Sequence, residues 1–124
     1  MKKKSDAGEP AIDKIEITKS AVHIIVKIIE YVPNAVLSKT IIKKTTGNVT
    51  VIAMASGEEL AEKTSPFDTY IQIIDGSAEI IIIDKKYHLN PGEAIVIPAH
   101  AAHIFNANEQ FKMISTIIKS GYEE

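Results

Sequence analysis

The sequence predicts an all-β protein built as an antiparallel sandwich or barrel. Isoleucine occurs 23 times among the 124 residues and leucine only three times, and side chains branched at Cβ suit a pleated sheet better than a helix. Short apolar runs recur about every ten residues, as in all-β folds. Gly, Pro, Asn or Asp separates most of these runs, which is typical of the turns between strands.

Eight strands are predicted in the chain after Pro33. They cover residues 36–43, 48–55, 70–75, 78–83, 86–89, 94–97, 103–107 and 111–119. Asp75-Gly76 lies between two isoleucine-rich runs, and this is a strong hairpin signal. Residues 80–83 are apolar on both strand faces, which favours a strand covered on both sides. Residues 58–62 carry three glutamates and are expected to form a solvated loop.

The N-terminal region has a less definite pattern. Residues 1–20 are expected to form a flexible or extended arm, because the first ten are too polar to bury a core. Residues 21–124 are expected to form a single domain. Within it, residues 21–31 place isoleucines at helical spacing but are also rich in β-branched side chains, so a helix and an extra strand both stay open.

Composition excludes several classes of function. Cys is absent, which excludes disulfides, thiolate metal sites and Cys nucleophiles. The sequence has 14 Lys, no Arg and a formal net charge of −2, so it offers neither guanidinium forks nor an overall basic field for nucleic acid. No apolar run approaches the roughly 20 residues of a membrane span, and the basic start lacks the apolar segment of a signal peptide. We therefore expect a cytoplasmic protein that binds neither nucleic acid nor membranes.

The turn residues resemble the two sequence motifs of the cupins. The motif spacing is kept by Gly57, Lys63, Ser65, Thr69 and Gly76 in the first motif and by Gly92, Pro98, His100, His103 and Ala107 in the second. The resemblance covers about residues 36–118 of the chain. It implies a small antiparallel double-sheet jelly-roll barrel, preceded by a short N-terminal arm or helix.

The resemblance does not extend to the family's metal ligands. Cupins hold a divalent metal with two His and one carboxylate of the first motif and one His of the second, and these positions correspond here to Lys63, Ser65, Thr69 and His103. Lys must lose its proton before it binds a metal, and hydroxyls are weak ligands for transition metals. We therefore expect no bound metal or other cofactor. A divalent transition metal held by an unusual set that includes His100 and His103 stays open.

The resemblance implies that these four side chains converge at the mouth of the barrel. Five apolar residues are expected to extend the pocket inward, three of them because side chains alternate between the two faces of a strand. Such a mostly apolar pocket with a few polar groups is typical of small-ligand sites. The nine predicted pocket residues are Lys63, Ser65, Thr69, His103, Ile71, Ile73, Phe105, Met54 and Met113.

Three functions remain open at this point. The preferred one is binding of a small molecule without the usual metal, because the scaffold is intact while three of the four cupin ligand positions are lost. An acidic molecule is one option, since the Lys63 ammonium would offer a positive charge where cupins place the metal. The other option for Lys63 is an outward side chain that pairs with Glu58, Glu59 or Glu62. The alternative is an enzyme of isomerase, dioxygenase, decarboxylase or lyase type that uses a non-standard metal site, or Lys63 and His103 as base or nucleophile. The third is an interaction protein with an idle pocket. The resemblance also implies a homodimer.

Overall fold

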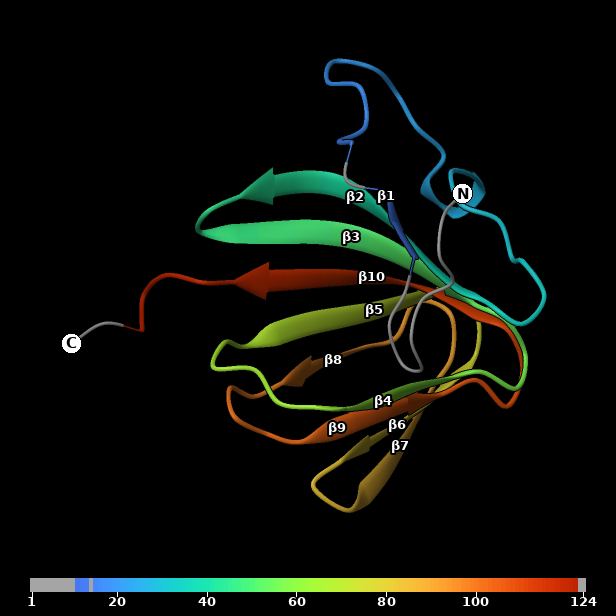
Figure 1. Ribbon diagram of the computed structural model, residues 1–124, viewed down its shortest axis with the longest axis vertical. Helices are drawn as coiled ribbons and strands as arrows, with labels where there is room; N and C mark the ends of the chain where they lie inside the picture. Colours follow the sequence, from blue (N-terminus) through green and yellow to red (C-terminus); the bar gives the residue numbers. More distant parts are fainter. Residues whose placement is uncertain (1–10, 14, 123–124) are drawn as a thin grey trace.

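The computed structural model of the chain describes residues 11–13 and 15–122. Within these residues, ten strands form two sheets (Figure 1). The strands of the larger sheet are β1 (Ala11–Asp13), β2 (Val36–Lys44), β3 (Gly47–Met54), β5 (Thr69–Gly76), β8 (Ala94–Ile97) and β10 (Phe111–Ile118). The strands of the smaller sheet are β4 (Glu59–Lys63), β6 (Ala78–Ile82), β7 (Lys85–Leu89) and β9 (His103–Asn106).

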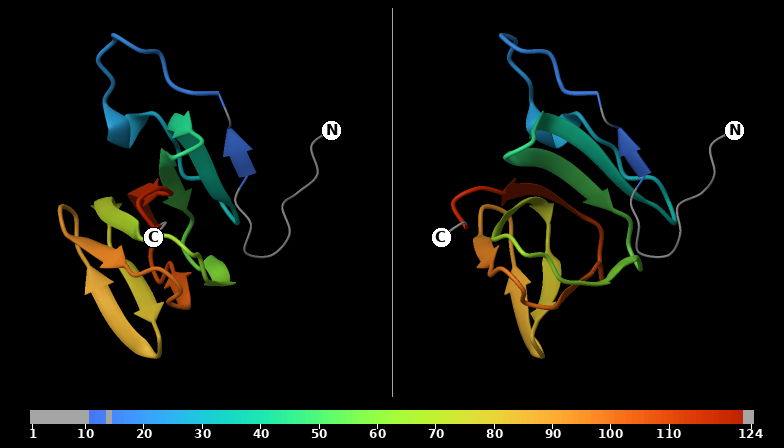
Figure 2. Two further views of the ribbon diagram at one scale, coloured as in Figure 1. Left: turned by 90° about the vertical axis from the view of Figure 1, so that its left-hand side faces the viewer. Right: turned by 60° about the vertical axis from the view of Figure 1, so that its left-hand side comes forward.

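The two sheets form opposite walls of one barrel (Figure 2). The larger sheet has the order β1-β2-β3-β10-β5-β8 and the smaller one β4-β9-β6-β7. Neighbouring strands are antiparallel except β1 and β2, which are parallel. The core between the sheets contains Met54, Ile73, Ile80, Phe111 and Met113, all almost completely buried. The predicted all-β double-sheet jelly roll is confirmed.

Each of the eight predicted strands is present, with its ends within one residue of the predicted ends. The prediction of a solvated loop at residues 58–62 was wrong, because β4 occupies most of this segment and pairs with β9. Leu60 is the one side chain of β4 that is buried, while its neighbours are exposed. A single apolar residue among charged ones gives too short a period-two pattern to predict a strand.

The hairpin predicted at Asp75-Gly76 was also wrong, since β5 and β6 belong to different sheets. The two residues form a corner at which the chain crosses from one sheet to the other. Gly76 has a φ of 69°, and a Cβ there would lie 2.1 Å from the backbone oxygen of Gln110. Only glycine therefore fits this close approach without a shift of backbone.

The tight hairpin turn of the smaller sheet lies instead at Ile83-Asp84, between β6 and β7. Both residues have positive φ, 44° and 67°, as a two-residue turn of type I′ requires. Isoleucine disfavours this conformation, which is why the sequence did not predict the turn. Ile80 and Ile82 face the core, whereas Ile83 is exposed at the turn, so the run 80–83 is not covered throughout.

The segment between β1 and β2 contains one short 3-10 turn, η1 (Ile25–Lys27), and no strand in its described part. It covers the outer face of the larger sheet, where Ile28 and Ile29 pack with Val51 and Ala53. The 21–31 region is therefore neither a regular helix nor an extra strand. The predicted boundary between an arm and a domain stays a prediction, and residues 1–10 lie outside the described residues. Among the described residues, no helix has the length and hydropathy of a membrane span.

Candidate ligand-binding cavity

A cavity of about 330 Å³ lies between the two sheets. Strands β2, β3, β5, β8 and β10 of the larger sheet form one side of it, and β4 and β9 of the smaller sheet form the other. Its size is at the lower end of the range of about 300–1,000 Å³ that is typical of small-ligand sites.

Seven of the nine predicted pocket residues line this cavity. They are Lys63, Ser65, Thr69, Ile71, His103, Phe105 and Met113. Met54 and Ile73 lie outside its lining and are fully buried in the core. Ile73 faces the same side of β5 as Ile71, but one pleat further along, where Phe111 and its neighbours already fill the interior.

A row of hydroxyl groups on the larger sheet was not predicted from the sequence. Thr40 of β2 pairs with Thr50 of β3, which in turn pairs with Ser115 of β10. Ser38 lies two residues before Thr40 on the same strand face, and all four side chains line the cavity. Polar residues that alternate with apolar ones usually mark the solvent face of a strand. Here the polar residues mark the inner face, so the alternation by itself predicts the wrong face of the strand.

These hydroxyl groups are largely shielded from bulk solvent. Ser38, Thr40 and Ser115 are 6%, 3% and 8% exposed, and within the described residues their side chains have no hydrogen-bonding partner in the protein. No fully enclosed side-chain oxygen in the described part of the chain lacks a partner. The hydroxyl oxygens therefore open onto the cavity.

Among the described residues, Lys43 and Lys63 are the charged ones that line the cavity, and no described Asp or Glu lines it. Neither lysine forms an ion pair with a carboxylate among the described residues. Lys43 lies near the end of β2 and Lys63 at the end of β4, so the two ammonium groups come from opposite sheets. Both lysines are exposed, so the charges of the described lining are positive and lie where the cavity meets solvent. Lys43 was not singled out from the sequence.

His103 is the imidazole that lines the cavity. Its Nδ1 lies 3.0 Å from the backbone oxygen of Ala101, and because a carbonyl only accepts, Nδ1 carries the proton. In the neutral ring, Nε2 is then the unprotonated nitrogen. The ring packs edge-on against Phe105, with 5.7 Å between ring centroids.

The structure does not bring His100 into the cavity with His103. His100 is exposed, with a φ of 71°, in the turn that starts at Pro98. Its backbone N–H donates a hydrogen bond of 2.6 Å to the backbone oxygen of Ser65. Within the described residues, no group of three or more His, Cys, Asp or Glu is arranged to hold a metal ion.

No protein-family model and no curated protein matches the sequence, but solved structures do match the fold. A cupin superfamily protein from Desulfitobacterium hafniense aligns with a TM-score of 0.80 at 25% identity, over 87% of this chain and 99% of that one. The chain has the cupin fold. A conserved protein of unknown function from Streptococcus pyogenes aligns with a TM-score of 0.79 at 28% identity, over 90% and 96% of the two chains.

A longer protein also matches this chain. The cupin 2 conserved barrel domain protein from Leptotrichia buccalis aligns with a TM-score of 0.73 at 27% identity over 76% of this chain. The chain spans only 46% of that protein's length. These three matches support the fold, and none of them indicates a ligand.

The residues that correspond to the cupin metal ligands lie around one space, because Lys63, Ser65, Thr69 and His103 all line the cavity. As a donor set they combine one imidazole and one ammonium with two hydroxyls. A divalent transition metal needs about three good protein ligands, such as imidazole or carboxylate. The donor set therefore does not fit the metal of the family.

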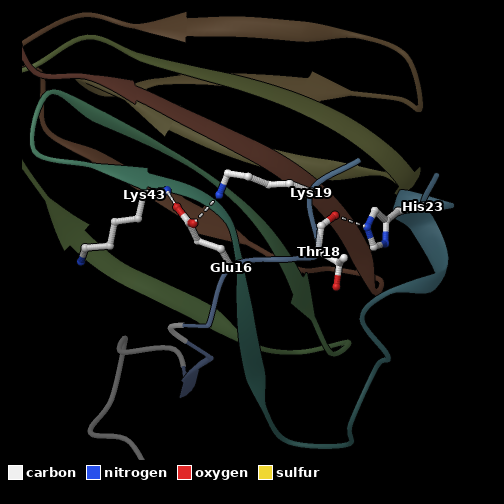
Figure 3. A network of polar contacts seen from close by, with 5 residues as sticks. All are labelled: Glu16, Thr18, Lys19, His23 and Lys43. Carbon is white, nitrogen blue, oxygen red and sulfur yellow. Dashed lines mark hydrogen bonds and ion pairs between the residues drawn. The ribbon is translucent and has the colours of Figure 1, made fainter. Parts of the chain in front are cut away.

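The N-terminal segment holds the end of β2 that carries Lys43 (Figure 3). One carboxylate oxygen of Glu16 accepts a hydrogen bond of 2.6 Å from the backbone N–H of Lys43, and the other accepts one of 2.9 Å from the Lys19 ammonium. The Lys19 hydrogen bond, with that from Lys43, lowers the pKa of Glu16 below its ordinary value. The side chain of Lys43 points away from Glu16, so this contact does not neutralise its charge.

Proposed function

We propose that this cupin binds a small acidic molecule in the cavity between its sheets, and that it does so without the family's metal. The observation that carries the proposal is the charge of the lining, which includes two lysines and, among the described residues, no carboxylate. Lys43 and Lys63 are exposed, so each attracts an anion with the moderate strength of a charge near the protein surface.

The buried hydroxyl groups support the same proposal. These hydroxyl oxygens reach the cavity, since no fully enclosed side-chain oxygen of the described residues lacks a partner. An apolar ligand that displaced water from the cavity would leave them without hydrogen bonds, at a cost of about 1–3 kcal/mol each. A polar ligand would supply partners instead. The cavity therefore favours a small molecule that is both acidic and polar.

The test compares carboxylic acids with their primary amides, which have the same size but no charge. We expect the acids to raise the melting temperature and to bind in calorimetry more tightly than the amides. Lys63→Met should weaken acid binding about ten-fold, as expected for one charged hydrogen bond. Lys44→Met is the matched control, because Lys44 lies on β2 but does not line the cavity. Equal binding by wild type and Lys63→Met would overturn the role of Lys63.

The metal question has its own test. Protein purified without a metal-affinity tag is analysed for zinc, iron, manganese and nickel. We expect much less than one metal ion per chain, because the donor set around His103 suits none of them. A stoichiometric transition metal would refute this part of the proposal.

A second candidate function is acid-base catalysis on the bound acid, of isomerase or lyase type. It is favoured by one observation: the hydrogen bond from Nδ1 to Ala101 leaves Nε2 of the cavity residue His103 ready to accept a proton. The test is exchange of the carbon-bound protons of a bound acid in heavy water, followed by NMR. Catalysis predicts exchange that His103→Gln abolishes while binding is retained. Binding alone predicts no exchange.

A further inference from the structure

Strand β2 carries a β-bulge that changes which side chains face the cavity. Thr40 pairs with Thr50 of β3, and Lys43 pairs with Asn48. Lys43 is three residues after Thr40, but Asn48 is only two residues before Thr50, so β2 contains one extra residue. Strict alternation from Thr40 would turn residue 42 inward. Instead Ile42 is exposed, and Lys43 lines the cavity.

Strand β4 carries a second irregularity with the same consequence. Leu60 pairs with Phe105 of β9, and Lys63 pairs with His103. Lys63 is three residues after Leu60, but His103 is only two residues before Phe105, so β4 also contains one extra residue. Strict alternation from Leu60 would turn Glu62 inward, but Glu62 does not line the cavity and Lys63 does. Without this extra residue, a carboxylate would occupy the place of the ammonium.

Each extra residue therefore determines whether a lysine lines the cavity. A bulge adds one residue on one strand and re-aims the side chains that follow, and a slip of one residue exchanges the two faces of a strand. One bulge lies in the larger sheet and the other in the smaller. Lys43 and Lys63, which follow the two bulges, both line the cavity from opposite walls and are exposed where it meets solvent.

The two walls between these lysines differ in chemistry. The larger sheet presents the row Thr40, Thr50 and Ser115, three directly paired residues on neighbouring strands. The smaller sheet presents Leu60 and Phe105, which are also directly paired. A ligand that fills the space would meet hydroxyl groups on one side and apolar surface on the other.

We propose that the two bulges aim Lys43 and Lys63 at a single carboxylate, and that the ligand is a polyhydroxylated monocarboxylate of about four to six carbons. Its hydroxyl groups meet the row on β2, β3 and β10, and its C–H groups pack on Leu60 and Phe105. This inference rests on the proposed function, because it specifies the class of acidic molecule that the cavity takes.

The first experiment measures binding of three matched sets of compounds to the full chain by calorimetry. Threonate, ribonate and gluconate carry a carboxylate and hydroxyls, butyrate, pentanoate and hexanoate carry only the carboxylate, and ribitol and sorbitol carry only hydroxyls. We expect the hydroxy acids to bind at least about ten-fold more tightly than either other set, since they gain both interactions. Ribitol phosphate is included to test the carboxylate assignment.

The outcomes separate this inference from the proposed function. If the unsubstituted acids bind as tightly as the hydroxy acids, the polyhydroxylated class is wrong while acid binding stands. Tighter binding of ribitol phosphate than of ribonate would overturn the carboxylate. If no acid of either set binds, the proposed function itself fails.

The second experiment tests the two bulges. Exchanging two neighbours, Ile42→Lys with Lys43→Ile, keeps the composition and places the lysine on the outward side of the bulged strand. We expect this exchange to weaken binding of the hydroxy acids as much as Lys43→Met does, about ten-fold. Retained affinity would show that a flexible lysine reaches the ligand from either position, and would overturn the role of the bulge.

A double-variant cycle tests whether both lysines hold one carboxylate. Residues that share a partner show non-additive effects, so Lys43→Met combined with Lys63→Met should weaken binding by clearly less than the product of the two single effects. Losses that multiply would overturn the single shared carboxylate. Lys44→Met again serves as the control and should leave the affinity unchanged.

Discussion

Four hydroxyl side chains give the interior of the barrel its polar character. Ser38, Thr40, Thr50 and Ser115 line the cavity at positions where alanine or valine would suit a purely structural barrel. Their hydroxyls open onto the cavity and form no hydrogen bond with the described protein, so they contribute little to the stability of the ligand-free fold. The proposed polar ligand would give them a role.

A stability measurement checks this explanation. Ser115→Ala removes a buried hydroxyl that has no partner in the described protein, so we expect its free energy of unfolding to stay the same or rise by up to about 1 kcal/mol. Ser65→Ala is the matched control, since it removes a hydroxyl that accepts a 3.2 Å hydrogen bond from the backbone of Phe67. It should cost about 1 kcal/mol. Urea denaturation without ligand measures the free energy of unfolding of both variants. A larger loss of this free energy for Ser115→Ala than for Ser65→Ala would contradict the explanation.

Two motif glycines provide a second test at the scale of single residues. Gly76→Ala would place a Cβ 2.1 Å from the Gln110 backbone oxygen, whereas Gly57→Ala would meet nothing within 4 Å. Both have positive φ, which alone costs about 1–2 kcal/mol for an L-residue. We expect about that loss for Gly57→Ala and about 3 kcal/mol or more for Gly76→Ala. Equal melting temperatures for the two variants would contradict the sheet-to-sheet corner at Gly76.

At the scale of elements, the N-terminal segment closes the outer side of β2. An unpaired edge strand offers free backbone groups to other chains, and β1 pairs with β2 at residues 37–39 while Glu16 binds the backbone N–H of Lys43 further along. The other end of the segment is tied to the sheet by Tyr31, whose hydroxyl donates to the carboxylate of Asp75. Burial, with this hydrogen bond, raises the pKa of Tyr31 above its ordinary value.

The Glu16 contact predicts a pH dependence of stability. Its pKa is lowered in the folded chain, so the charged form stabilises the fold at neutral pH, and this contribution is lost as the pH falls through the folded pKa. Glu16→Gln should therefore be less stable than wild type at pH 7, with a difference that shrinks below about pH 4. Glu109→Gln is the control, at an exposed residue of the β9–β10 loop, and should leave the free energy of unfolding at pH 7 unchanged. A pH-independent difference for Glu16→Gln would contradict this assignment.

At the scale of the whole molecule, part of the larger sheet keeps apolar side chains exposed. Tyr70 and Val96 are cross-strand partners on β5 and β8 and are 41% and 55% exposed, and Ile118 at the end of β10 is 54% exposed. The run 80–83, which was expected to be covered on both faces, places Ile80 and Ile82 in the core and leaves Ile83 66% exposed at the turn. We propose that the β10-β5-β8 face forms the contact of the expected homodimer.

Sedimentation at micromolar concentration tests the homodimer. We expect a dimer for wild type and a monomer for Tyr70→Lys combined with Val96→Lys, because a charge would be buried in an apolar contact. Val22→Lys is the control, since Val22 is 98% exposed but lies in the N-terminal segment. A monomeric wild type would refute the proposal, and a dimer in the double variant would place the contact elsewhere.

Local signals in the sequence were sufficient for the strands, their ends and the cupin resemblance. Apolar runs and turn residues act over a few neighbours, and motif spacing is a property of the chain alone, so seven cavity residues such as Lys63 and His103 were also anticipated. Strand β4 was not predicted from the sequence, because only one of its side chains is buried.

Long-range pairing decided the rest. Whether β6 continues a hairpin after Gly76 or crosses to the other sheet depends on strands far away in the chain. The extra residue in a bulge exists only relative to its partner strand, so the inward turn of Lys43 could not be derived from β2 alone. Likewise, an alternating Ser or Thr does not reveal which face is inside until the second sheet closes over it.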